Sequence, residues 1–172
     1  MNKNSIKKLV FSALFTALIT ISTMFIRIPL PLGYVNMGDA FIFLAVFILG
    51  PLYGTLAAAL GSAIADIVGY VVYAPGTLII KTLMAVTTYY IYHGLRTLTN
   101  KNVLAEIIAG LVGSVVMALG YFLYETLFFE TAAVAILNAP WNIVQGIVGV
   151  ALAVAVMRVL EKTKLIYKLK QD

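Results

Sequence analysis

The chain has 172 residues, of which 62% are hydrophobic and only 11% charged, a composition outside the range of soluble domains. It has no cysteine, which excludes a disulfide framework, a thiol nucleophile and a cysteine-ligated metal site, and its single histidine does not by itself predict a metal site. The net charge of +5 comes from basic residues at the N-terminus, in one short connection and in the C-terminal tail, which is typical of cytoplasmic loops rather than of a nucleic-acid binder.

Hydrophobic segments follow one another along almost the whole chain. A spanning helix needs roughly 20 mainly apolar residues, and by that rule there are about six segments. Their expected ranges are about 9–26, 37–50, 52–72, 75–92, 103–129 and 140–159. Gly50 and Pro51 separate the second from the third, while Pro75 and Pro140 open the fourth and sixth, because proline is tolerated in a first helical turn. The sequence therefore predicts an all-α integral membrane protein, a compact bundle of about six transmembrane helices in a single domain over residues 1–172.

The basic residues predict the orientation. With an even number of spans, ten of the twelve Lys and Arg residues fall on one side: Lys3, Lys7, Lys8, Arg96, Lys101, Arg158, Lys162, Lys164, Lys168 and Lys170. Arg27 falls on the other side, and Lys81 falls inside the membrane. Because cytoplasmic loops are enriched in Lys and Arg, both termini are expected to be cytoplasmic. No small-residue cleavage site follows the first segment, so we expect it to be retained rather than removed as a signal peptide.

Polar side chains interrupt five of the segments, and all of them fall in the outer half of the membrane. They are Asp39, Asp66, Lys81, Tyr121, Glu125, Trp141, Asn142 and Gln145. An ionisable group in hydrocarbon costs at least about 2.5–3.5 kcal/mol, so its presence usually indicates a partner or a wet cavity. The inner halves are almost entirely apolar, whereas a proton or ion path needs polar groups across the full depth. The pattern therefore predicts an outward cavity that is closed toward the cytoplasm.

Several of these residues have two interpretations. A rise of about 1.5 Å per residue puts Asp66 and Lys81 at one level, roughly 10 Å and 9 Å below the outer helix ends. They can form a structural ion pair, contact a ligand, or do both. Glu125 also fits an interfacial carboxylate, and Trp141 and Tyr124 fit an aromatic belt at the membrane surface.

The connection at residues 27–37 contains Pro29, Pro31, Tyr34 and Asn36. Proline restricts the backbone to extended conformations, so this segment is expected to be a rigid connection. It can act as a lid over the cavity, with the aromatic ring stacking on a small polar ring and the amide binding its edge. An ordinary connecting loop is the alternative.

Ala13 and Ala17 form an Ala-x-x-x-Ala pair near the cytoplasmic end of the first segment, beside Ser12 and Thr16. Small residues four apart make a flat strip on which another helix can pack closely. Such a strip can serve packing within the chain or contact with another protein.

Four stretches of the sequence carry a family resemblance. They are Asn-Met-Gly-Asp-Ala-Phe at 36–41, Leu-Gly-Pro-Leu-Tyr-Gly at 49–54, Gly-Ser-Ala-Ile-Ala-Asp at 61–66 and Ala-Pro-Gly-Thr-Leu-Ile-Ile-Lys at 74–81. With its length and its expected spans, the whole chain resembles the membrane-embedded S components of energy-coupling factor (ECF) vitamin transporters. The resemblance is to the branch grouped with riboflavin, pyridoxine and hydroxymethylpyrimidine carriers.

The resemblance implies a function with partners. An S component of the bacterial cytoplasmic membrane binds a vitamin from outside, then topples in the membrane to release it. A T component and two ATPase subunits drive that step, so ATP is used by the partners and this chain binds no cofactor or metal. Ala13 and Ala17 are the positions implied to contact the T component.

The residues at the expected outward cavity form the candidate substrate-binding set. They are Asn36, Asp39, Asp66, Lys81, Tyr121, Glu125, Trp141, Asn142 and Gln145. Carboxylates, amides and aromatic rings suit a small hydroxylated nitrogen heterocycle, because carboxylates accept hydrogen bonds from hydroxymethyl or ring N–H groups. A pyridoxine-like or hydroxymethylpyrimidine-like compound is favoured, and riboflavin is third.

Two other classes compete with this interpretation. In a self-sufficient secondary transporter, Asp66, Lys81 and Glu125 would relay protons, but the apolar inner halves argue against it. In a small intramembrane enzyme, Asp66 or Glu125 would be a general base, but no nucleophile or metal cluster accompanies them.

Overall fold

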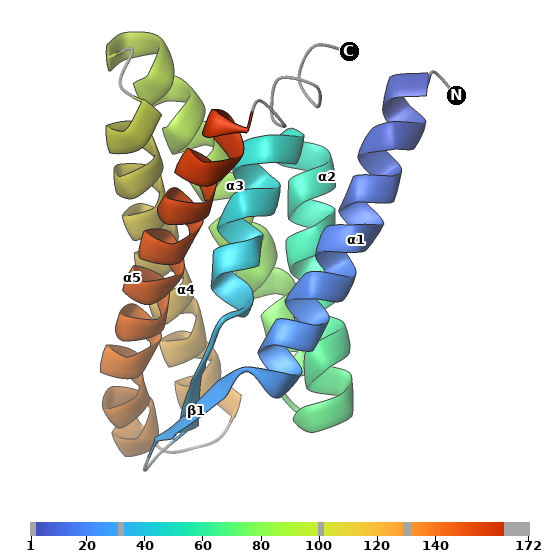
Figure 1. Ribbon diagram of the computed structural model, residues 1–172. Helices are drawn as coiled ribbons and strands as arrows, with labels where there is room; N and C mark the ends of the chain where they lie inside the picture. Colours follow the sequence, from blue (N-terminus) through green and yellow to red (C-terminus); the bar gives the residue numbers. More distant parts are fainter. Residues whose placement is uncertain (1–2, 31–32, 100–101, 129–131, 164–172) are drawn as a thin grey trace.

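The computed structural model describes residues 3–30, 33–99, 102–128 and 132–163. Within these ranges the chain forms five helices and one two-stranded antiparallel sheet (Figure 1). In chain order the elements are α1 (Lys3–Phe25), β1 (Arg27–Leu30), β2 (Gly33–Asn36), α2 (Gly38–Gly69), α3 (Ala74–Thr99), α4 (Asn102–Phe128) and α5 (Ala132–Lys162). Four of the described helices, α1, α2, α4 and α5, are long and apolar enough to cross a membrane.

The described residues form five helices rather than the expected six, because the second and third predicted segments together make up α2. The boundary predicted between them at Gly50 and Pro51 lies inside this helix. The helix is interrupted at Gly50, whose φ of 82° and ψ of −168° are not helical. A Cβ on Gly54 would lie 2.8 Å from the carbonyl oxygen of Ala45, whereas residues nine apart in a straight helix are roughly 13 Å apart. The chain therefore reverses at Gly50, and residues 38–49 and 51–69 form two arms that pack against each other (Figure 1).

Gly50 is the residue that permits this reversal without a loop. Its backbone conformation is essentially restricted to glycine, and other residues held in such regions cost about 1–3 kcal/mol. We expect Gly50→Ala to lower the free energy of unfolding by about that amount, as measured by thermal unfolding in one detergent. Gly94→Ala is the matched control, because a Cβ there meets nothing within 4 Å and alanine stabilises a helix interior by about 0.5–1 kcal/mol. Equal effects of the two substitutions would contradict a special role for Gly50.

The last helix begins earlier than expected. Pro140 was predicted to open the sixth segment, but α5 starts at Ala132 and Pro140 lies inside it. A proline removes one backbone hydrogen bond, and membrane helices tolerate this where neighbouring groups satisfy the freed carbonyl. The additional turns before Pro140 bring Asn138 onto the same helix as Trp141, Asn142 and Gln145.

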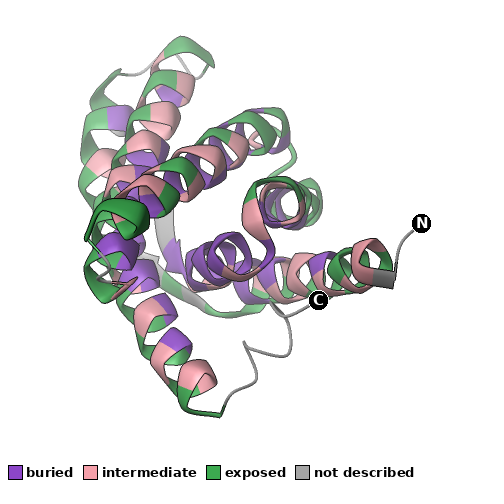
Figure 2. Cartoon of the chain, turned by 90° about the horizontal axis from the view of Figure 1, so that it is seen from above, coloured by how far each residue is buried: buried purple, intermediate pink, exposed green. Residues whose placement is uncertain are grey.

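Buried residues face the interior of the bundle, and α1 lies at its edge (Figure 2). In the most apolar stretch of each helix, 22% of the residues of α1 are buried, against 61% for α2. The inner face of α1 packs on α2: Ile19 is fully buried, Ser12 donates to the Tyr53 carbonyl at 2.8 Å, and Thr20 donates to the Gly61 carbonyl at 2.9 Å. The opposite face of α1 is left exposed.

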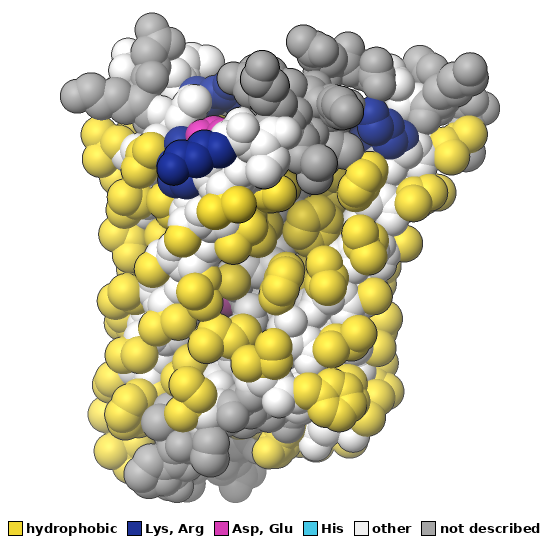
Figure 3. Space-filling model, in the orientation of Figure 1, with side chains coloured by type: hydrophobic (Ala, Val, Ile, Leu, Met, Phe, Trp, Pro, Cys, Tyr) yellow, Lys and Arg dark blue, Asp and Glu magenta, His cyan; other side chains and the backbone are white. Residues whose placement is uncertain are grey.

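The two ends of the bundle differ in charge. The start of α1 and the end of α5 lie at the same end, where Lys and Arg side chains gather, while hydrophobic side chains cover the visible face between the two ends (Figures 1 and 3). The sheet lies at the opposite end. This matches the separation of charge on which the predicted orientation rests. The cytoplasmic position of the termini stays a prediction.

The connection between α1 and α2 is a β-hairpin, so the expected helical bundle carries one short two-stranded sheet that was not predicted from the sequence. β1 pairs antiparallel with β2, with Ile28 opposite Val35 and Arg27 opposite Asn36. The extended conformation that Pro29 favours is compatible with a strand. Pro31 and the side chain of Tyr34 lie outside the described residues, so the expected stacking of Tyr34 stays a prediction.

Candidate substrate-binding site

A polar cavity of about 170 Å³ lies between the helices at the end of the bundle that carries the hairpin. Its lining comes from the end of α1, the end of β2, the second arm of α2, the α2–α3 turn, the start of α3, the end of α4 and the first half of α5. The lining residues are Thr23, Asn36, Ser62, Asp66, Tyr70, Tyr73, Thr77, Lys81, Tyr121, Glu125, Asn138, Trp141, Asn142 and Gln145. Every described helix therefore contributes to one site.

Helical periodicity explains why these residues meet. Side chains three or four positions apart lie on the same face of a helix. On α2, α3 and α4 one pair of lining residues has this spacing, and on α5 several lining residues follow it. The pairs are Ser62 and Asp66, Thr77 and Lys81, and Tyr121 and Glu125; the run on α5 is Asn138, Trp141, Asn142 and Gln145.

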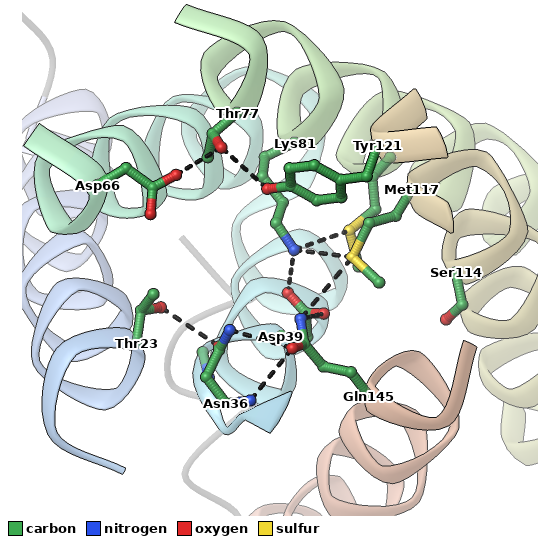
Figure 4. A network of polar contacts seen from close by, with 12 residues as sticks. Thr23, Asn36, Asp39, Asp66, Thr77, Lys81, Ser114, Met117, Tyr121 and Gln145 are labelled. Carbon is green, nitrogen blue, oxygen red and sulfur yellow. Dashed lines mark hydrogen bonds and ion pairs between the residues drawn. The ribbon is translucent and has the colours of Figure 1, made fainter. Parts of the chain in front are cut away.

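A buried polar network forms the floor of the cavity (Figure 4). The Lys81 ammonium forms an ion pair with Asp39, which is 1% exposed, and lies 2.8 Å from the sulfur of Met117. Gln145 Nε2 donates to the other Asp39 oxygen at 2.7 Å. Gln145 Oε1 accepts from the backbone and side-chain nitrogens of Asn36, both at 3.1 Å. The network therefore joins the end of the hairpin to α2, α3 and α5.

A second chain of hydrogen bonds crosses the cavity wall (Figure 4). The Thr77 hydroxyl donates to the Asp66 carboxylate at 2.5 Å and lies 3.0 Å from the Tyr121 hydroxyl. Because the threonine proton goes to the carboxylate, the tyrosine hydroxyl is the donor in the second contact. These hydrogen bonds link side chains of α2, α3 and α4 and thereby fix the orientation of Asp66 and Tyr121.

Glu125 belongs to a third group of residues. Its carboxylate accepts from the Tyr73 hydroxyl at 3.4 Å and from Asn138 Nδ2 at 3.3 Å on each oxygen. Tyr73 lies in the turn between α2 and α3, where burial and the nearby Glu125 carboxylate raise its pKa to about 12. Its hydroxyl therefore stays protonated and remains a donor at neutral pH.

The structure brings eight of the nine predicted substrate-binding residues onto the lining of this cavity. The ninth, Asp39, lies below the lining and holds Lys81 in place. Six further lining residues were missed: Thr23, Ser62, Tyr70, Tyr73, Thr77 and Asn138. The sequence held a signal for three of them, since Ser62, Thr77 and Asn138 stand four positions before Asp66, Lys81 and Asn142. That these residues bind a substrate stays a prediction.

The expected pairing of Asp66 with Lys81 needs correction. The ion pair of Lys81 is with Asp39, whereas Asp66 accepts the short hydrogen bond from Thr77. Depth alone allowed either carboxylate, because Asp39 starts α2 on the same side of the membrane. The rotation of the first arm of α2 turns Asp39 toward α3, where Lys81 meets it.

Ala13 and Ala17 are both exposed on α1. They lie apart from Ser12, Ile19 and Thr20, which make the contact with α2. The strip therefore does not serve packing within the described part of this chain.

A bundle of apolar helices with a polar cavity at one end defines a membrane protein that binds a small molecule inside the bundle. A family model for the ECF-type riboflavin transporter, S component, matches residues 3–162. The chain belongs to this family, which confirms the resemblance found in the sequence. It is therefore a subunit of a membrane transporter and not an enzyme.

Two individual proteins are similar to this chain. A protein of Pyrococcus woesei, described as "Uncharacterized protein in gap 3'region", is 33% identical over 146 residues, which cover 84% of this chain and 95% of that protein. A solved structure described as "Structure and mechanism of the S component of a bacterial ECF transporter" has a TM-score of 0.71 and 24% identity. The match covers 92% of this chain and 98% of the chain in the solved structure, and at this identity it shows that the two share a fold.

Proposed function

We propose that this chain is the substrate-binding subunit of an ECF-type importer in the cytoplasmic membrane. It captures a small vitamin or vitamin precursor from outside and delivers it inward together with a T component and two ATPase subunits. The observation that carries the proposal is the polar cavity of about 170 Å³ at the end of the bundle opposite the basic side chains. With the basic end in the cytoplasm, the cavity faces outward.

The size and chemistry of the cavity support a small heterocycle as substrate. Pockets for drug-sized ligands usually have about 300–1,000 Å³, so about 170 Å³ suits a single substituted ring better than a tricyclic ring with a polyol tail. Carboxylates, amides and tyrosines surround this volume and can bind hydroxymethyl and ring nitrogen groups. We therefore favour a pyridoxine-like or hydroxymethylpyrimidine-like compound. Riboflavin stays the third candidate, and it is kept because the matched family is described by that vitamin.

The need for partners follows from what this chain carries. The glycines are dispersed through apolar segments, and no Gly-rich phosphate loop occurs in the sequence. ATP hydrolysis must then be supplied by other subunits. The exposed Ala13 and Ala17 on α1 offer a flat surface for the coupling helices of a T component.

Native mass spectrometry of the detergent-purified chain tests the proposal directly. The chain is expressed in cells supplied with B vitamins, and we expect a co-purified mass matching pyridoxine, a hydroxymethylpyrimidine or riboflavin. The same compounds are then titrated into ligand-free protein. A chain that neither carries nor binds any of them would contradict the proposed function.

A proton-coupled secondary transporter is the alternative, and uptake by the chain alone distinguishes it. We expect no uptake of the bound vitamin into vesicles that contain this chain without a T component and ATPases, whether or not a proton gradient is present. Uptake driven by the gradient alone would support the alternative.

A further inference from the structure

Glu125 is a buried carboxylate whose hydrogen-bonding capacity is poorly used. It is 5% exposed, lines the cavity, and accepts only long bonds of 3.3–3.4 Å from Tyr73 and Asn138 among the described residues. Hydrogen bonds between charged and neutral groups are normally about 2.7–2.9 Å long, and a carboxylate can accept about four of them. The two oxygens of Glu125 therefore have room for a further donor.

No described cation neutralises this carboxylate. Lys81 is the basic side chain among the lining residues, and its ammonium is paired with Asp39 on the floor of the cavity. The other basic side chains that the structure describes lie in the first turns of α1 and the last turns of α3 and α5, at the opposite end. A carboxylate buried at membrane depth without a cation is costly, and a donor or cation arriving with the substrate would offset that cost.

Two further polar atoms on the cavity lining lack a partner among the described residues. Asn138 Oδ1 and Ser62 Oγ are both buried without a hydrogen bond. The Asn138 amide donates through its nitrogen to both Glu125 oxygens, so its own oxygen lies beside the carboxylate as a second acceptor. The Ser62 hydroxyl on α2 can either donate or accept, whereas the Glu125 carboxylate and Asn138 Oδ1 can only accept, so this wall requires donors from the ligand.

We propose that Glu125 and Asn138 form a subsite for a nitrogen donor group of the substrate, either an aromatic amino group or a protonated ring nitrogen. The inference rests on the proposed function and specifies which part of the substrate contacts which wall. An amino group has two N–H donors, one for the Glu125 carboxylate and one for Asn138 Oδ1. The dione edge of riboflavin instead presents two carbonyl oxygens on either side of one N–H. These oxygens are acceptors, and their contact with the Glu125 carboxylate would be repulsive.

Two pairs of compounds test this subsite by calorimetric titration of the detergent-purified chain. The first pair is 4-amino-5-hydroxymethyl-2-methylpyrimidine and its 4-oxo analogue, in which the amino donor becomes an acceptor. The second is pyridoxine and its carbocyclic analogue, in which the ring nitrogen becomes C–H. For the parent compound that binds, we expect the nitrogen donor form to bind at least about tenfold more tightly than its analogue, since hydrogen bonds to charged groups have effects of this size.

Glu125→Gln should remove most of that preference, leaving the two members of the pair within about threefold of each other. Asp66→Asn is the matched control, because it also neutralises a carboxylate lining the cavity and should weaken both members of the pair alike. Circular dichroism shows whether each variant is folded. Should Glu125→Gln fail to fold, Asn138→Ala takes its place, because it removes the second acceptor of the same subsite and should likewise reduce the preference.

The outcomes separate the subsite from the function. A wild-type chain that binds a parent compound and its analogue equally, or that binds riboflavin alone, overturns the subsite while the proposed function stands. A preference that survives in Glu125→Gln also overturns it. Failure of the wild-type chain to bind any of these vitamins overturns the proposed function itself.

Discussion

Replacing Lys81 with methionine is expected to lower the free energy of unfolding by about 3–5 kcal/mol. The change removes the cation that pairs with Asp39, whose side chain is 1% exposed, and leaves that charge with the Gln145 amide as its described partner. An isolated carboxylate at this depth cannot be solvated by water, so the folded state loses far more than one contact. Thermal unfolding in one detergent, followed by circular dichroism, measures the loss.

A second substitution identifies the partner of Lys81. Adding Asp39→Asn to Lys81→Met should restore most of the lost stability, because no unpaired charge then remains on the floor of the cavity. Adding Asp66→Asn should give no such recovery, since Asp66 accepts its hydrogen bond from Thr77. Recovery by Asp66→Asn in place of Asp39→Asn would refute the pairing and support the one that depth alone suggested.

The sequence predicted the depth of the polar residues well. A helix rises about 1.5 Å per residue, so counting from the expected ends put Asp66, Lys81 and Glu125 in the same half of the membrane. The structure places all three on one cavity. The family was also accessible from sequence, because the motifs around Asp39, Gly50 and Lys81 are local in the chain. These predictions needed no knowledge of how the helices pack.

Helix rotation and tertiary support were not predictable in the same way. Lys81 had two carboxylates at a suitable depth, and the choice of Asp39 depends on how α2 is turned against α3. The start of α5 before Pro140 depends on neighbouring groups that compensate for the proline, whereas helix propensity alone predicts that the helix begins at Pro140. The hairpin pairs residues across a short connection whose prolines indicated only extended backbone. Each missed feature involves a second element of the fold.

Enlarging the alanine strip of α1 is expected to abolish transport without weakening vitamin binding. Ala13 and Ala17 are exposed, and the contacts of α1 with α2 come from Ser12, Ile19 and Thr20. Ala17→Phe should therefore leave the cavity and the bundle intact while preventing close approach of a T-component helix. Uptake of radiolabelled vitamin by the assembled transporter measures the loss, and titration of the isolated chain measures binding.

The same chain contains a control for this experiment. Ala151 and Ala155 on α5 have the same four-residue spacing and are also exposed, so Ala155→Phe adds the same bulk to a different face of the bundle. It should leave uptake near the wild-type level if α1 alone provides the coupling surface. Co-purification of the T component should likewise be lost for Ala17→Phe and kept for Ala155→Phe. Loss of vitamin binding in Ala17→Phe would show instead that α1 supports the cavity. Equal loss of uptake in both variants would show that small residues are needed on more than one face of the bundle.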